Sequence, residues 1–169
     1  MYVRTEVVVA RPEVTRLRFE DFYAAEFDRV FRSAYALSRD PHTASEATQE
    51  AFSRAFARWT RLRRKDWAGA WVTTTALNLV RRHIRDASRT PPQVSPDTSE
   101  SETVASVDLL RALSTLPWRQ RQAATLFYVA DLPVVAVAEA MGLSQGAVKS
   151  HLSRARQQLR SALGEQDDG

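Results

Sequence analysis

The residues best suited to hold another molecule lie between Ser144 and Arg160, a stretch with cations and no acid. Its polar residues and one glycine are Ser144, Gln145, Gly146, Lys149, Ser150, His151, Arg154, Arg156 and Arg160. A solvated helix normally mixes both signs of charge, so a purely cationic helix face favours a polyanion such as DNA. An ordinary basic surface helix is the alternative interpretation.

A helix-turn-helix would position these side chains. Pro133 suits a first helical turn, and the apolar residues after it, Val134, Val137, Ala138 and Met141, recur at helical spacing. Gly142 stands where that helix must end, because glycine enters the left-handed region at little cost. Ser144 is a natural N-cap for the next helix. In such a motif the first turns of the second helix enter the major groove.

A second group of cations lies in the first half of the chain. Its members are Arg61, Arg63, Arg64 and Lys65 in an expected loop, and Arg81, Arg82 and Arg85 near the end of an expected helix. Cations neutralise phosphates and release counterions, and aromatic rings stack unpaired bases. Trp71 is interpreted as a core residue, whereas Trp67 at the loop edge remains open between core packing and base stacking.

A polar stripe of Glu46, Gln49, Glu50 and Ser53 recurs at helical spacing ahead of both groups in the sequence. An ordinary solvated face and a binding face are equally good interpretations of it. Two carboxylates one turn apart could serve as an acid–base pair, but no histidine, lysine or glycine-rich loop converges on them in sequence. The histidines, His42, His83 and His151, lie on different expected helices without ligand spacing. We therefore expect no enzyme activity, no metal and no cofactor.

The composition of the chain excludes several kinds of protein and of binding site. The 169 residues include no cysteine, which excludes disulfides and cysteine-based zinc sites and fits a reducing compartment. No apolar run approaches the roughly 20 residues that span a bilayer. The formal charge is only +4, so the basic charge must be concentrated locally. A cytoplasmic protein is the expectation.

The periodicity predicts an all-α chain of two small helical domains. The predicted parts are an arm at 1–18, a helical domain at 19–88, an acidic Pro/Ser linker at 89–102, a four-helix helix-turn-helix domain at 103–163 and a tail at 164–169. Helices are expected over 19–38, 41–60 and 67–87, with Phe56 buried and Asp66 capping the third. An extended linker of about 15 residues would reach on the order of 45 Å, so the domains could bind at separated places.

The order of these parts and three strings resemble the extracytoplasmic-function group of bacterial sigma factors. Residues 47–56 are similar to the group's core-polymerase-binding helix, residues 70–82 to its −10 element helix, and residues 113–121 with 138–156 to its −35 element domain. The similarity covers residues 19–163. It implies a protein that binds RNA polymerase core and directs it to promoter DNA, with an anti-sigma factor as a candidate further partner.

The resemblance also assigns roles to residues. Core polymerase would be bound by Glu46, Gln49, Glu50 and Arg54. The −10 strand would be held by Arg61, Arg63, Arg64, Lys65, Trp67, Asn78, Arg81, Arg82 and Arg85. The −35 duplex would be bound by Ser144, Gln145, Gly146, Lys149, Ser150, His151, Arg154 and Arg156. The alternative from a different class is a stand-alone helix-turn-helix regulator whose N-terminal domain senses a ligand or dimerises.

Overall fold

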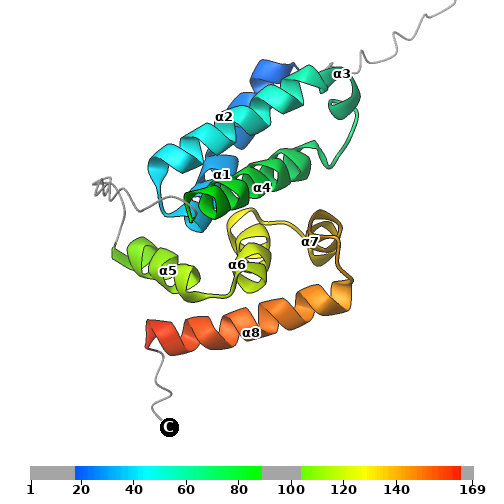
Figure 1. The fold of residues 1–169 in the computed structure, drawn as a ribbon. Coiled ribbons are helices and arrows are strands. Elements are labelled where there is room, and N and C mark those ends of the chain that lie inside the picture. Colours follow the sequence, from blue (N-terminus) through cyan, green and yellow to red (C-terminus); the bar gives the residue numbers. More distant parts are fainter. Residues whose placement is uncertain (1–17, 89–103, 165–169) are drawn as a thin grey trace, which may run out of the picture.

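The computed structural model describes residues 18–88 and 104–164, and every regular element within these ranges is helical (Figure 1). The first range holds α1 (Phe19–Ser38), α2 (Pro41–Ala57), α3 (Trp59–Leu62) and α4 (Ala68–Ala87). The second holds α5 (Val104–Thr115), α6 (Trp118–Ala124), the π-helical segment η1 (Thr125–Val129), α7 (Val134–Met141) and α8 (Gln145–Leu163). The predicted all-α class is confirmed. None of these helices is long and apolar enough to cross a bilayer.

Three predicted segments lie wholly or mostly outside the described residues: the arm at 1–18, the linker at 89–102 and the tail at 164–169. The two predicted helical domains correspond to the described ranges. We call them the N-terminal half, residues 18–88, and the C-terminal half, residues 104–164.

In the N-terminal half, α1, α2 and α4 pack against one another as a three-helix bundle. Small side chains let the helices approach closely, and the alanines Ala34, Ala44, Ala47, Ala51, Ala55 and Ala76 are at most 1% exposed. Val30, Phe52 and Val72 fill the space between them. Close packing of this kind stabilises the bundle because each buried apolar group leaves water and gains dispersion contacts.

The turn from α1 to α2 follows from three consecutive residues. Arg39 ends α1 in the left-handed region with φ of 58°. Asp40 then caps α2 by accepting a hydrogen bond from the Thr43 backbone N–H at 2.8 Å, and Pro41 takes the first helical position. The Asp–Pro start predicted from the sequence is therefore confirmed.

The predicted second and third helices differ from the structure at their junction. The expected helix over 41–60 ends at Ala57, and the short α3 follows it, so that Arg61 lies in a helical turn rather than in an open loop. The capping prediction for Asp66 is wrong: Trp67 is the N-cap of α4, and no side chain caps that end. The run of cations and aromatic residues offers no glycine or proline that would mark this break in the sequence.

Helix α4 contains three consecutive β-branched residues, which weaken helix propensity. The hydroxyls of Thr73, Thr74 and Thr75 each donate to the carbonyl four residues earlier, at 2.8–2.9 Å. Val72 and Ala76 beside them are fully buried. Tertiary packing therefore holds this stretch helical, as expected from the sequence.

The C-terminal half contains the predicted helix-turn-helix in α7 and α8. Gly142 ends α7 in the left-handed region with φ of 63°, and the Ser144 hydroxyl caps α8 by accepting from the Ala147 N–H at 3.1 Å. Ala138, 5% exposed, lies in the buried side of α7. These features confirm the helix end at Gly142 and the N-cap at Ser144 that the sequence predicts.

The corner between α5 and α6 contains one half-buried cation, Arg121. The guanidinium of Arg121 donates to the carbonyl oxygens of Ser114 at 2.6 Å and Leu116 at 3.1 Å, at the end of α5. Burial lowers the pKa of Arg121 from its ordinary value. Arg121 is thus a structural residue that closes the α5–α6 corner.

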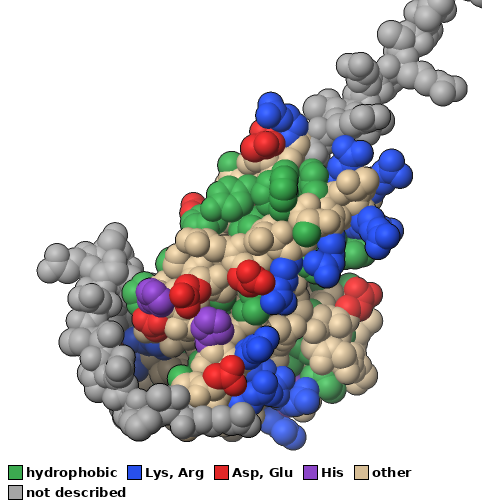
Figure 2. Space-filling model, turned by 45° about the horizontal axis from the view of Figure 1, so that its top comes forward, with side chains coloured by type: hydrophobic (Ala, Val, Ile, Leu, Met, Phe, Trp, Pro, Cys, Tyr) green, Lys and Arg blue, Asp and Glu red, His purple; other side chains and the backbone are tan. Residues whose placement is uncertain are grey.

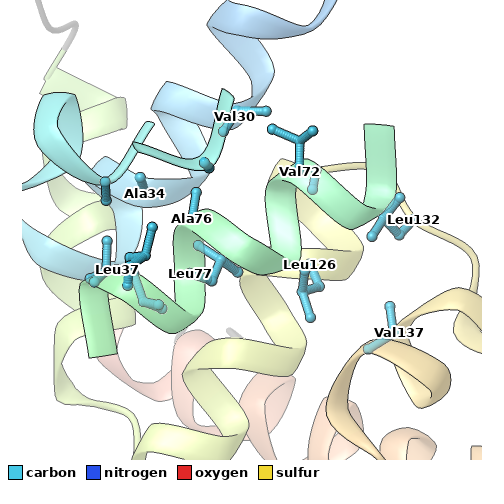
Figure 3. Close-up of a cluster of buried hydrophobic side chains, with 14 of the residues drawn as sticks. Val30, Ala34, Leu37, Val72, Ala76, Leu77, Leu126, Leu132 and Val137 are labelled. Carbon is cyan, nitrogen blue, oxygen red and sulfur yellow. The ribbon is translucent and has the colours of Figure 1, made fainter. Parts of the chain in front are cut away.

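The two halves are packed against each other (Figure 1). One buried cluster contains Val72 and Leu77 of α4 together with Leu126, Leu132 and Val137 from the C-terminal half. Figure 3 shows these side chains from both halves directed into one apolar region. A second cluster places Ala36 of α1 among the buried residues of α5 and α8. The sequence predicted the halves but left their relative placement undetermined.

Candidate nucleic-acid and polymerase interfaces

The outer face of α8 presents the predicted −35 residues to solvent. Val148, Leu152, Ala155 and Leu159 are buried and fix the helix on its inner side. Ser144, Gln145, Gly146, Lys149, Ser150, Arg154 and Arg156 are exposed on the other side. Within the described ranges, no carboxylate lies within ion-pair distance of Lys149, Arg154 or Arg156. The face can therefore bind phosphates without first breaking an internal ion pair.

Two positions on this helix differ from the rest. His151 is half-buried, and its Nδ1 is buried without a hydrogen-bond partner among the described residues, so it faces inward more than its neighbours do. Around Gly146, the nearest atom to an added Cβ would be the Ser144 hydroxyl oxygen at 3.9 Å. The space there is open, so the glycine is not required by packing; its small size leaves the first turn of α8 accessible to a ligand.

The predicted −10 residues form a second basic surface, on α3, the following loop and α4. Arg61, Arg64, Lys65, Arg81, Arg82 and Arg85 are exposed, and Arg63 is half-buried. Of these seven, only Arg82 has a carboxylate near it in the described structure, Asp86 at 3.8 Å. Figure 2 shows basic side chains gathered along one side of the molecule. Both predicted cationic faces are thus accessible and largely unpaired.

The structure resolves the question about the two tryptophans. Trp67 is 49% exposed at the start of α4, and the Lys65 ammonium lies 5.9 Å from its ring centre. Trp71 is half-buried, with the Arg58 guanidinium 5.9 Å from its ring centre. Trp67 is therefore available for stacking beside a cation, whereas Trp71 belongs mainly to the packed side, as expected.

A single stripe along α4 unites several of these residues. Trp71, Thr74, Asn78, Arg81 and Arg85 follow one another at intervals of three or four, so they share one face of the helix. Asn78 is exposed near the middle of the stripe. An amide that both donates and accepts can read the edge of an unpaired base, with the flanking arginines directed to its phosphates.

The predicted polymerase-binding residues lie together on the exposed side of α2. The Arg54 Nε donates to Glu50 Oε1 at 2.7 Å, and Gln49 Nε2 donates to the Ser45 hydroxyl at 3.2 Å. Exposed intrahelical pairs of this kind are weak, because solvent screens them, so a partner can replace them at little cost.

Glu46 is placed differently from the rest of that group. Its Oε2 lies 3.7 Å from His42 Nδ1 and 3.8 Å from His83 Nδ1, which joins α2 to α4. The described residues contain no group of three side chains arranged to hold a metal ion. Glu46 therefore lies at the edge of the stripe and is directed toward α4. Gln49, Glu50 and Arg54 make no such contact with another described helix and form the part of the stripe that faces solvent.

The sequence reasoning missed Phe56. The expectation placed it in the buried face of α2, but its side chain is 64% exposed, so that expectation is wrong. It lies seven residues after Gln49 and three after Ser53, on the same side of the helix, with its ring centre 5.0 Å from that of Phe19. The seven-residue spacing from Gln49 was the signal that could have identified it.

Comparison with known proteins covers both halves. Residues 22–90 match the family model described as sigma-70 region 2, and residues 106–159 match that of sigma-70, region 4. The RNA polymerase sigma-E factor of Streptomyces avermitilis is 31% identical over 157 residues, spanning 89% of this chain and 88% of that protein. The ECF RNA polymerase sigma factor SigE of Mycolicibacterium smegmatis is 32% identical over 148 residues; the match covers 80% of this chain but only 58% of that longer relative.

Two solved structures share the fold. The sigma factor RpoE in complex with the anti-sigma factor NepR from Bartonella quintana superposes with a TM-score of 0.76 at 22% identity, covering 88% of this chain and 98% of that one. CnrH in complex with the cytosolic domain of CnrY gives a TM-score of 0.67 at 20% identity, with 86% of each chain covered. At these identities the likeness concerns the arrangement of helices.

Proposed function

The chain belongs to the extracytoplasmic-function sigma factors of RNA polymerase, and from this membership we propose which of its residues contact each ligand during promoter recognition. The observation that carries the proposal is the pair of accessible cationic faces, one on each half, with few internal carboxylates to neutralise them. One face suits duplex DNA and the other suits an opened strand. A chain with both faces is suited to direct polymerase to a promoter.

The −35 duplex is the ligand proposed for α8. The first turns of the second helix of a helix-turn-helix enter the major groove, which puts Gln145, Lys149 and Ser150 against base edges or nearby phosphates. Arg154 and Arg156 lie further along the helix, where the backbone of the duplex would pass. The open space at Gly146 lets the helix start approach a phosphate. These contacts would be strongly salt-dependent.

The unpaired −10 strand is the ligand proposed for the face formed by α3, its loop and α4. Extruding a base costs a few kcal/mol, and a site that holds the free base offsets that cost only for the right sequence. Asn78 supplies the polar contact, Trp67 a ring for stacking, and Arg81 and Arg85 the phosphate contacts. The protein would therefore favour opened DNA through binding energy alone.

RNA polymerase core is the partner proposed for α2, through Gln49, Glu50, Arg54 and the exposed ring of Phe56. An exposed aromatic residue beside charged and amide groups is typical of a protein-binding surface. One of the similar structures contains a sigma factor in complex with an anti-sigma factor, so an anti-sigma protein is a candidate second partner. We place this activity in the cytoplasm, where bacterial polymerase works, and assign the chain no reaction of its own.

Reconstitution with purified RNA polymerase core tests the proposal. Core plus this protein should produce transcripts that start at defined promoters on bacterial DNA, and core alone should produce none. A chain that binds promoter DNA tightly but does not bind core would instead be a stand-alone regulator.

A further inference from the structure

Helix α7 lies beside the first turns of α4 (Figure 1), and an open groove of about 350 Å³ runs between the two helices. This volume falls within the range of about 300–1,000 Å³ that is typical of small-molecule sites. Each helix presents residues at intervals of three or four, so one face of each helix forms a wall. The lining consists of Trp67, Ala70, Trp71 and Thr74 on the α4 side and Ala136, Glu139 and Ala140 on the α7 side.

The groove stays open because the α7 wall is built mainly from small side chains. Ala136 and Ala140 are half-buried opposite two large rings, and they are too short to fill the space. Trp67 is 49% exposed and Trp71 is half-buried, so part of each ring is accessible from solvent. Aromatic rings pack best against other flat rings, either offset and stacked or edge to face. The walls therefore suit a planar, mostly apolar molecule.

The polar groups of the groove favour one sign of charge on that molecule. Among the described residues that line it, only Glu139 is charged, and no cation of the described structure lies within ion-pair distance of its exposed carboxylate. The Thr74 hydroxyl already donates to the Ala70 carbonyl oxygen at 2.8 Å, which leaves it only acceptor capacity toward a ligand. An unpaired carboxylate beside tryptophan rings favours a ligand with a positive charge.

Two cations of the protein lie close to the same rings but outside the groove. The Arg58 guanidinium is 5.9 Å from the centre of the Trp71 ring, and the Lys65 ammonium is 5.9 Å from that of Trp67. Neither residue belongs to the lining, so the parts of the rings that face the groove are free of both cations. Because Arg58 and Lys65 are exposed, solvent and salt also screen their repulsion of a cationic ligand.

We propose that this groove binds a small planar aromatic cation of the arylalkylamine class, with its ammonium group held by Glu139 and its ring held by Trp67 and Trp71. Binding of the ligand is independent of the function proposed above. Its consequence rests on that function: a ligand in the groove covers Trp67, which is proposed to stack an unpaired base, and so lowers promoter opening.

Naphthylmethylammonium is a suitable probe, and naphthylacetate, which has the same ring and the opposite charge, is its control. The four tryptophans give four indole N–H signals in the NMR spectrum of the isotope-labelled full chain. Naphthylmethylammonium should shift the signals of Trp67 and Trp71 in a saturable manner and leave those of Trp59 and Trp118 unchanged. Naphthylacetate should bind at least fivefold more weakly, because the carboxylate in the groove repels it.

Two variants separate the charge of the groove from its shape. Glu139→Gln keeps the size of the side chain and removes its charge, so the preference for the cationic probe should fall below twofold. Asp131→Asn neutralises an exposed acid outside the lining and should leave the preference unchanged. Ala140→Leu fills the groove and should weaken binding of the cationic probe at least tenfold, with circular dichroism as the check that it folds.

Equal affinity of the unaltered protein for the two probes would overturn the proposal. A preference that survives Glu139→Gln would do so as well, and because Glu139 is exposed this variant does not perturb the core. Equal shifts of all four indole signals would show that the probe binds without using the groove.

Transcription by core polymerase plus this protein distinguishes the ligand site from the sigma role. The cationic probe should lower the yield of promoter-directed transcript several-fold for the unaltered protein and much less for Ala140→Leu. Equal inhibition of the two proteins would contradict the consequence drawn for Trp67. Absence of any promoter-directed transcript without the probe would contradict the sigma role, while the NMR titration still decides whether the groove binds the cation.

Discussion

At the scale of single residues, Asp40 shows how one side chain fixes a helix start. Burial by itself raises the pKa of Asp40, but hydrogen bonds from the Thr43 side chain and backbone and from the His42 backbone favour the carboxylate and outweigh the burial. The net pKa lies below the ordinary value of 3.8. The charged form is therefore the one that caps α2.

Replacing Asp40 should reveal this cap as a pH-dependent loss of stability. Asp40→Ala should lower the free energy of unfolding by about 1 kcal/mol at neutral pH. Because the folded-state pKa is depressed, the stabilisation is fully present above the unfolded-state pKa and is lost as the pH falls through the folded-state value. The difference between the two proteins in urea unfolding should therefore shrink below about pH 4. A constant difference from pH 7 to pH 3 would contradict the assignment, and Asp28→Ala, at an exposed site on α1, serves as the control.

Phe56 provides a prediction that separates binding from stability. Phe56→Ala should weaken binding to RNA polymerase core by about tenfold, since exposed aromatic residues often dominate protein interfaces. The free energy of unfolding should change by no more than about 1 kcal/mol, because the side chain is mostly exposed and its ring contact with Phe19 is an edge contact. Tyr128→Ala is a matched control, because Tyr128 is an exposed aromatic residue on the C-terminal half. Equal effects of the two changes on core binding would remove Phe56 from the interface.

At the scale of elements, α8 combines a buried apolar side with an unpaired basic side. Lys149→Ala should weaken binding to a −35 duplex and reduce the steepness of the salt dependence by about one unit of log K per log salt, which corresponds to one lost phosphate contact. Arg154→Ala should do the same. Gln158→Ala, a neutral exposed change on the same helix, should leave the slope unaltered. An unchanged slope for both cation variants would make this face an ordinary solvated surface.

Helix α2 allows the corresponding test of the polymerase contact. Glu50→Arg removes the partner of Arg54 and places two cations on adjacent turns. Affinity for core, measured by titration, should fall by at least tenfold, while binding of the full chain to a −35 duplex stays unchanged. Asp28→Arg gives the same change of net charge on α1 and should leave core binding intact. If both variants bind core equally well, the stripe is merely solvated.

Most elements could be predicted from the sequence, because their ends carry residues with strong local preferences. Gly142, Ser144 and the Asp40–Pro41 pair each determine a turn through their own backbone or side-chain chemistry, and the structure has those turns where the sequence placed them. The break at Arg58 could not be predicted, since no such residue marks it and tertiary packing decides. The start of α4 was predicted within one residue, but its cap was not, because Trp67 rather than Asp66 is the N-cap and no side chain caps that end.

The exposed positions of the charged site residues could be predicted from the sequence. A cation on a helix surface stays exposed in almost any packing, so the basic positions of α8 and of the α4 region are where the sequence placed them, with His151 and Arg63 half-buried. An aromatic residue such as Phe56 has no such constraint, because its type fits a buried or an exposed position, and only its seven-residue spacing from Gln49 indicated the exposed side.

At the scale of the whole molecule, the association of the two halves was beyond sequence reasoning. Leu126, Leu132 and Val137 have the pattern of core residues whether they meet α4 or only their own helices. Only the structure shows that they belong to one buried cluster with Val72 and Leu77 of the other half. That packing joins the two halves through buried apolar side chains.

The most direct test of the account is to map, in one complex, the DNA that this protein contacts when bound to core at a promoter it directs. Nuclease protection should cover the −35 element, and permanganate should modify unpaired thymines near −10 in the same complex. Lys149→Ala should weaken the first signal and Asn78→Ala the second. Protection at only one element, or the same pattern without polymerase, would contradict the account.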